Sequence, residues 1–373
     1  MGNRRDGRLL SFMTKASAPG KIILFGEHAV VYGQPALAVP VSEVHADAEV
    51  SDIDRAGIWV DAPDIGLHEE LSRLAPDHPL AAVINSVFAA LNIDVIASEA
   101  KQSRIIQEEI ASSQKHAPRN DVTKGLKIKI TSTIPLASGL GSGAAVSVAI
   151  IRALSAHLEK PFANEKISEL AYEVEKIHHG TPSGIDNTVV TYGKPIFFIP
   201  APSALRASPP QAGEKKSPPR SRGGRKGGQI TPLRVAKPFT IVIGDTGLPA
   251  PTKESVSDVR ELWEENPQKM DALFAAAGSI AKTARQAIMG GHPERLGPLM
   301  NENHALLQEM TVSSPELDFL TEASLRAGAL GAKLSGGGRG GNMIALSTKE
   351  KAPAIVEALL DAGAKKVIVT EIS

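Results

Sequence analysis

A glycine-rich turn between a strand-like and a helix-like segment places the strongest constraint on how this chain can fold. It lies in IPLASGLGSGAAVSVAIIRAL, residues 134–154, where three glycines alternate with small residues before an Ala/Val/Ile run at helical spacing. Alternating glycines let successive backbone N–H groups converge on one point, and a helix starting near Gly143 adds its own unpaired N–H groups and dipole. We therefore predict a phosphate-binding turn, with a plain tight turn as the alternative. Because no lysine follows the last glycine, this is not the P-loop pattern, and a cation must come from elsewhere.

The composition excludes several classes of function. The chain has 373 residues, enough for two domains that each have a core. Lys+Arg and Asp+Glu balance at 41 each, so we expect neither nucleic acid nor a membrane as a partner. The absence of cysteine excludes disulfides and thiolate chemistry and fits a reducing cytoplasm. No signal peptide, myristoylation motif or membrane span is recognised, and Met13 is a candidate start, so we expect a soluble, cytoplasmic protein.

Hydrophobic patterning predicts an α+β chain with two insertions. Before the glycine turn, the expected elements are strands at 22–25, 35–41, 45–53 and 57–63, a helix at 79–92 and a half-buried strand at 125–135. After residue 230, helices at 253–291, 301–312, 315–328 and 352–364 mix with strands around an antiparallel sheet. The polar segment 95–122 and the basic, Pro/Gly-rich segment 208–229 interrupt this pattern and are interpreted as surface insertions.

A second candidate site is the stretch KIHHGTPSGIDNTVVTYG together with Glu175 just upstream. Glu175 closes a helical run, where a carboxylate suits Mg²⁺, and Asp186 lies in a Pro/Ser/Gly turn that is expected to lead into a β-branched strand. An Asx turn at Asp186 and a solvated charge at Glu175 are the alternatives. His178 and His179 are adjacent, which is poor spacing for metal ligands, so structural roles are favoured.

Two further segments carry polar or glycine-rich features. In APGKIILFGEHAVVYG, Lys21 stands at the start of a buried strand and is either paired or a surface lysine, while Glu27 and His28 in the next turn are ambiguous alone. The segment SGGGRGG joins two strands and indicates either a backbone close to a ligand or a flexible tip. A phosphate nest, a lysine, two carboxylates and a second glycine loop together indicate Mg²⁺-dependent phosphoryl transfer.

These motifs make the chain resemble the GHMP kinase superfamily and, within it, the mevalonate kinases. APGKIILFGEHAVVYG, PLASGLGSGAA and KLSGGGRGGN occur in the order typical of the superfamily, and EKIHHGTPSGIDN resembles the mevalonate kinase version of the segment that bears the aspartate. The resemblance covers nearly everything from Ala16 onward except the two insertions. It implies ATP- and Mg²⁺-dependent phosphorylation of the 5-hydroxyl of mevalonate, a step of isoprenoid precursor biosynthesis.

The resemblance also implies roles for individual residues. Asp186 and Lys21 would be catalytic, with Asp186 acting as the base or as the charge that orients the hydroxyl. Glu175 and Ser142 would hold Mg²⁺. The substrate side would comprise Glu27, His28, Thr252, Ser335, Gly336 and Gly337. ATP would be held by Pro135, Ser138, Gly139, Leu140, Gly141, Ser142, Gly143, Ala144 and Ala145.

Two positions depart from the family pattern. The usual G-L-G-S-S carries its metal-binding second serine where this chain has Gly143, so Ser142 or a water would take that coordination site. Arg339 stands where the family generally has glycine, and it either reaches a phosphate or points to solvent.

The implied architecture is a two-domain GHMP kinase fold of the α+β class. An N-terminal mixed-sheet ATP-binding domain is expected at 14–207, the basic insertion at 208–229, and a C-terminal ferredoxin-like α/β-sandwich domain at 230–373. We expect a homodimer. A kinase for another small alcohol or for a phosphorylated mevalonate derivative is the first alternative, and a non-catalytic ligand-binding regulator is the second.

Overall fold

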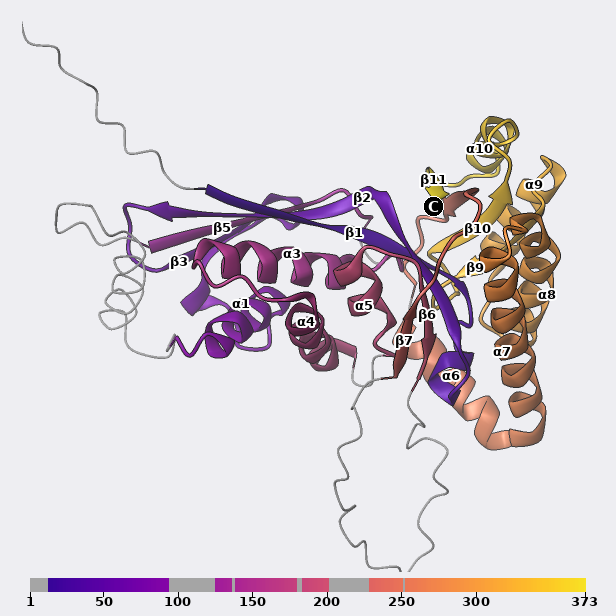
Figure 1. Ribbon diagram of the computed structural model, residues 1–373, viewed down its shortest axis with the longest axis horizontal. Coiled ribbons are helices and arrows are strands. Elements are labelled where there is room, and N and C mark those ends of the chain that lie inside the picture. Colours follow the sequence, from indigo (N-terminus) through magenta and orange to yellow (C-terminus); the bar gives the residue numbers. More distant parts are fainter. Residues whose placement is uncertain (1–12, 94–124, 136–137, 180–182, 201–227, 251) are drawn as a thin grey trace, which may run out of the picture. The chain divides into compact units, whose positions relative to one another are not determined.

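The computed structural model describes residues 13–93, 125–135, 138–179, 183–200, 228–250 and 252–373. The chain divides into two compact units (Figure 1). The first comprises Met1–Ala18, His45–Thr133 and Gly143–Gly180, and the second Pro19–Val44, Ile134–Ser142 and Thr181–Ser373. The predicted insertion at 95–122 and most of the one at 208–229 lie outside the described residues. The expected domain boundaries remain a prediction.

The first unit is a mixed sheet with helices. Its strands are the first part of β1 (Met13–Phe25), the second part of β2 (Ala36–Ile53), β3 (Ile58–Ala62), β4 (Leu67–Glu70) and β5 (Gly125–Ser132). β5 pairs antiparallel with β2 and parallel with β3, which pairs antiparallel with β4. Helices α1 (Pro79–Ala90), α3 (Ser142–His157) and α4 (Asn164–His179) lie on one side of these strands (Figure 1). The separate strands expected at 35–41 and 45–53 are one strand of 18 residues; its first four residues are all buried, and burial alternates regularly from Val44 to Ser51.

The second unit contains the remaining parts of β1 and β2 and a four-stranded sheet. β2 pairs with β6 (Ile196–Ile199), which pairs with β7 (Gln229–Pro232), so the expected insertion ends before Gln229, whose backbone is in register with Ile199. The four-stranded sheet has the order β11-β8-β10-β9 and is antiparallel throughout. Its strands are β8 (Phe239–Asp245), β9 (Gly331–Ser335), β10 (Asn342–Ser347) and β11 (Lys366–Ile372).

Helices cover the four-stranded sheet and bury its core. They are α6 (Thr252–Glu265), α7 (Pro267–Met289), α8 (Leu296–Glu309), α9 (Pro315–Arg326) and α10 (Ala352–Asp361). Figure 1 shows α7, α8 and α9 beside one another near β9 and β10. Tyr32 from the short helix η1 (Ala29–Tyr32) stacks on Phe274 of α7 with ring centroids 4.0 Å apart, so the Lys21–Tyr32 segment is anchored in this core. The other single-turn helices are η2 (Pro63–Ile65), η3 (Leu71–Arg73) and η5 (Pro293–Arg295).

The segment that follows the Pro/Ser/Gly turn is a helix, which corrects the expected β-branched strand. It forms α5 (Ile185–Tyr192), and Asp186 lies in its first turn. Ile185 and Val189, four residues apart on one helix face, are both fully buried in an apolar cluster with β6. Gly193 ends the helix in a left-handed conformation and donates to the Val189 carbonyl. Burial of this face therefore outweighs the strand preference of β-branched residues.

Asn266 caps α7, and its loss is expected to destabilise the second unit. Its side-chain oxygen accepts a hydrogen bond of 3.1 Å from the backbone N–H of Lys269, which otherwise has no partner within the helix. We expect Asn266→Ala to lower the free energy of unfolding by about 1 kcal/mol. Chemical denaturation measures this, with Glu265→Ala at the exposed neighbouring position as the control; equal stability of the two variants would contradict the capping role.

Candidate active site

Lys21 is a buried cation at the centre of the predicted site. Its backbone N–H donates to the Leu140 carbonyl at 2.9 Å, which ties β1 to the glycine turn. Its Nζ lies 3.1 Å from Asp186 Oδ2 and donates to the Gly139 carbonyl at 3.0 Å. Only 4% of the Lys21 side chain is exposed, so it is not the surface lysine of the alternative interpretation. The cation that the glycine turn lacks is therefore supplied by a strand more than a hundred residues earlier.

The glycine turn needs its glycines for two different reasons. Gly139 and Gly141 have φ values of 84° and 74°, in the left-handed region that favours glycine. A Cβ on Gly141 would lie 2.9 Å from Cγ of Lys21, so the turn and the lysine stem are in direct contact. At Gly139 and Gly143 a Cβ would meet no atom within 4 Å, so the backbone is open on that side. Because α3 begins at Ser142, this open stretch of backbone lies at the N-terminus of a helix. The unpaired N–H groups of a helix N-terminus favour binding of a phosphate.

Asp186 is the partially exposed member of the lysine–aspartate pair. Its side chain is 32% exposed, whereas Lys21 is almost fully buried, so a molecule from solvent can reach the carboxylate. Its place in the first turn of α5 puts the negative charge at the positive end of a helix. The pair therefore offers a proton acceptor and a fixed positive charge within one ion-pair distance.

The second glycine loop, residues 335–341, is held by side chains on both of its ends. Ser335 Oγ donates to the Ile23 carbonyl at 2.9 Å and accepts from the Ile23 N–H at 3.2 Å. At the other end, Asn342 Nδ2 donates to the Ser138 carbonyl. A Cβ on Gly337 would lie 2.7 Å from Thr252 Oγ1 at the start of α6. The loop thus contacts β1, the first glycine turn and α6, and it is not a free flexible tip.

Glu27 and His28 are buried beside this loop. His28 Nε2 lies 3.0 Å from the Gly337 carbonyl, and because a carbonyl only accepts, Nε2 carries the proton. Burial lowers the pKa of His28 to about 4, so the ring is neutral at pH 7. Glu27 is 2% exposed and pairs with Lys333 of β9 through a short contact. Burial raises the pKa of Glu27, and the Lys333 charge opposes that shift.

The Arg339 side chain is bound to neighbouring segments of the second unit. Its guanidinium pairs with the carboxylate of Asp258 on α6 and donates to the Thr311 carbonyl at 3.2 Å. Its backbone N–H donates to the Val312 carbonyl at 2.9 Å, with φ at 58°. Arg339 thus ties the loop to α6 and does not point freely to solvent, and its contact with a phosphate stays a prediction.

Glu175 and Ser142 are the donors predicted for Mg²⁺. Within the described residues, no three His, Cys, Asp or Glu side chains gather as a ready-made metal site. Glu175 lies half-buried on α4 of the first unit, and Ser142 lies at the start of α3, assigned to the second. Mg²⁺ is normally held by one or two carboxylates together with substrate phosphates, so a carboxylate and a hydroxyl are donors of the chemical type that Mg²⁺ binds. These two assignments stay predictions. The side chains of His178 and His179 lie outside the described residues.

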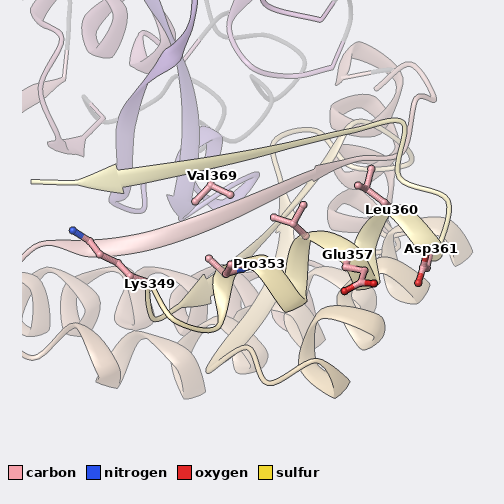
Figure 2. Close-up of a pocket in the computed structure, with 8 residues that line it drawn as sticks. Lys349, Pro353, Glu357, Leu360, Asp361 and Val369 are labelled. Atoms are coloured by element: carbon pink, nitrogen blue, oxygen red, sulfur yellow. The ribbon is translucent and has the colours of Figure 1, made fainter.

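A separate hollow lies between α10 and β11, and no predicted site residue lines it (Figure 2). Pro353, Leu360 and Val369 give it an apolar lining, and Lys349 at its edge is paired with Glu371. The Lys349 and Glu371 side chains of this pair are 72% and 41% exposed, whereas Lys21 is almost fully buried. We therefore place the candidate active site at the lysine–aspartate pair.

Comparison with known proteins shows the family of this chain. The family models for the GHMP kinases N terminal domain and the GHMP kinases C terminal match residues 104–194 and 284–365. The mevalonate kinases of Thermococcus sibiricus and Thermococcus gammatolerans are 35% and 36% identical over 372 and 371 residues, in each case 96% of both chains. The crystal structure of L. major mevalonate kinase in complex with R-mevalonate is 27% identical, covers 97% of each chain and has a TM-score of 0.74.

The matches to both GHMP kinase domains and to these relatives show that the chain is a GHMP kinase, a class that uses ATP as the phosphoryl donor. Within that class, this chain belongs to the mevalonate kinase family. No described helix is both long and apolar enough to cross a membrane.

Sequence reasoning missed three residues that hold the site together. Lys333 pairs with Glu27, Asn342 holds the carbonyl of Ser138, and Asp258 holds Arg339. One signal was available for Lys333: a lysine in the middle of AKLS, a strand otherwise without charge, needs a buried partner. No local pattern indicates the roles of Asn342 and Asp258, since their partners are far away in the sequence.

Proposed function

We propose that this chain transfers the γ-phosphoryl group of ATP to the 5-hydroxyl of mevalonate, with Mg²⁺ as the metal. The observation that carries the proposal is the Lys21–Asp186 pair of 3.1 Å, whose lysine also contacts the phosphate-type turn through Gly139. Family membership supports the substrate, because the relatives are mevalonate kinases and one neighbour holds R-mevalonate.

In this proposal Asp186 accepts the proton of the 5-hydroxyl while that oxygen attacks the γ-phosphorus. One O–P bond forms, the bond from the γ-phosphorus to the β–γ bridging oxygen breaks, and ADP leaves. Lys21 stabilises the negative charge on the attacking oxygen and on the transferred group, because its position is fixed before the reaction. When bound, Mg²⁺ neutralises charge on the phosphate oxygens. Glu175 and Ser142 are its proposed ligands, and the backbone from Gly139 to Gly143 is proposed to hold the phosphates.

A phosphorylated acceptor is the less favoured substrate. It would require cations that are free to bind the additional phosphate, and two of the cations beside the second glycine loop already have carboxylate partners. Lys333 is paired with Glu27, and Arg339 is paired with Asp258. Because both cations are paired, an acceptor that presents an uncharged hydroxyl group fits this part of the site better than one that presents a phosphate.

The proposal is tested by ADP release with Mg²⁺, ATP and a panel of mevalonate, phosphomevalonate, galactose and homoserine. We expect turnover with mevalonate, none with the other three, and complete loss on chelation of the metal. Faster turnover with another member of the panel would keep the kinase class and contradict the substrate. The proposed homodimer is tested separately by light scattering, and the proposed cytoplasmic location by cell fractionation.

A further inference from the structure

Lys333 is a fully buried cation that the proposed reaction does not use. It lies in the middle of β9, where every residue is buried, and its own side chain is 0% exposed. Its ammonium donates to Glu27 Oε1 and to the carbonyl of Leu334. Glu27 itself is 1% exposed at its side chain, so both charges are removed from water.

A pair buried this deeply need not add to the free energy of unfolding, since burial acts against the charged form of both Glu27 and Lys333. The desolvation of two ions generally cancels most of their attraction, and apolar residues of similar volume are often as stable or more so. Ile344, the residue opposite Lys333 on β10, is fully buried, so an apolar side chain can fill this face of the sheet. The pair is therefore better explained by a requirement for charge at Glu27.

The second carboxylate oxygen of Glu27 indicates what that charge is for. Glu27 Oε2 is buried, and no donor in the described part of the chain reaches it. A buried carboxylate oxygen without a donor is costly, so the site is incomplete until a donor arrives. The next residue, His28, contacts the second glycine loop at Gly337, which places Glu27 beside the substrate-side loop.

We propose that Lys333 is a positioning residue: it supplies the counter-charge that fixes Glu27, so that Oε2 accepts a hydrogen bond from a hydroxyl of the bound acceptor. This inference rests on the proposed function. Mevalonate has two hydroxyls and one carboxylate. The carboxylate is repelled by Glu27, and the 5-hydroxyl gives its proton to Asp186, so the 3-hydroxyl is the remaining donor.

The inference is tested with Lys333→Met, Glu27→Gln and the double variant, and with Lys349→Met as a control that removes an exposed lysine. We expect each single variant to raise KM for mevalonate by roughly 10- to 100-fold, as for a hydrogen bond to a charged group. KM for ATP stays unchanged in all of them. The double variant should be no worse than Glu27→Gln alone, because Lys333 acts only through Glu27.

A substrate analogue separates positioning from a general effect on folding. 5-Hydroxy-3-methylpentanoate lacks only the 3-hydroxyl, so wild-type protein should lose the same 10- to 100-fold in kcat/KM with it, while Glu27→Gln should barely distinguish it from mevalonate. This comparison needs no Lys333 variant and holds even if Lys333→Met fails to fold. Equal losses in wild type and Glu27→Gln would overturn the assignment of the hydroxyl.

The kinetic results distinguish a wrong role for Lys333 from a wrong proposed function. Wild-type turnover of mevalonate, with an unchanged KM in folded Lys333→Met, would overturn the inference and leave the function intact. Absence of turnover by wild-type protein would contradict the proposed function and, with it, the inference.

Discussion

Replacement of Asp186 by alanine is expected to lower kcat for mevalonate phosphorylation by about 10²- to 10⁴-fold, the usual contribution of a positioned general base. The carboxylate is the exposed member of a pair with a buried lysine, so its loss removes the proton acceptor and leaves Lys21 without its counter-charge. Asp186 is linked to the glycine turn through Lys21, which also donates to the Gly139 carbonyl, so we expect ATP affinity to be largely retained as long as Lys21 keeps that bond. Stopped-flow or coupled assays measure kcat, and calorimetry measures ATP binding.

Two further variants separate the loss of a proton acceptor at Asp186 from the loss of any aspartate side chain. Asp186→Asn keeps the shape of the side chain without its basicity, and it should be as inactive as the alanine variant if proton acceptance is the main role. Asp361→Ala removes an exposed aspartate at the end of α10 and should leave kcat unchanged. An Asp186→Asn enzyme with near wild-type kcat would contradict the base and leave only a structural role.

Replacement of Gly141 by alanine is expected to lower kcat by roughly 10²-fold, because a displacement of about 1 Å at a reacting group costs that much. The new Cβ would lie 2.9 Å from Cγ of Lys21, and φ at Gly141 is 74°, so the substitution strains the turn and pushes on the lysine stem. Either adjustment moves Lys21 away from Asp186 or the turn away from the phosphates. Steady-state kinetics on the purified variant measures the loss.

Gly363→Ala is the matched control for this substitution. Gly363 has φ of 96°, and a Cβ there would meet no atom within 4 Å, so it carries backbone strain without a contact. We expect it to cost about 1–2 kcal/mol of stability and to leave kcat unchanged. If Gly141→Ala behaved like Gly363→Ala in both respects, contact between the turn and Lys21 would not matter for catalysis.

Local sequence patterns predicted the glycine turn and the strands of the second unit, but they did not predict helix α5. Strand alternation, helical spacing and glycine-rich turns are local signals, so the glycine turn, α3 and the antiparallel sheet of the second unit were predictable. α5 was not, because its β-branched residues favour a strand and only the burial of Ile185 and Val189 reveals a helix.

No local sequence pattern predicted which charged side chains form ion pairs. Lys21 could be a surface lysine by pattern alone, and only the fold brings it to Asp186, whose position depends on α5. Arg339 was interpreted without its partner because Asp258 is 81 residues away. Such pairs depend on how distant segments meet, which spacing along one chain does not encode.

The most direct test of the central claim is transfer of a labelled γ-phosphoryl group from ATP to mevalonate by the purified protein, with the product resolved by phosphorus NMR and mass spectrometry. The account predicts one product, with the phosphoryl group on O5, formed together with an equal amount of ADP. ADP formed without a phosphorylated acceptor, or label on any other oxygen, would contradict it.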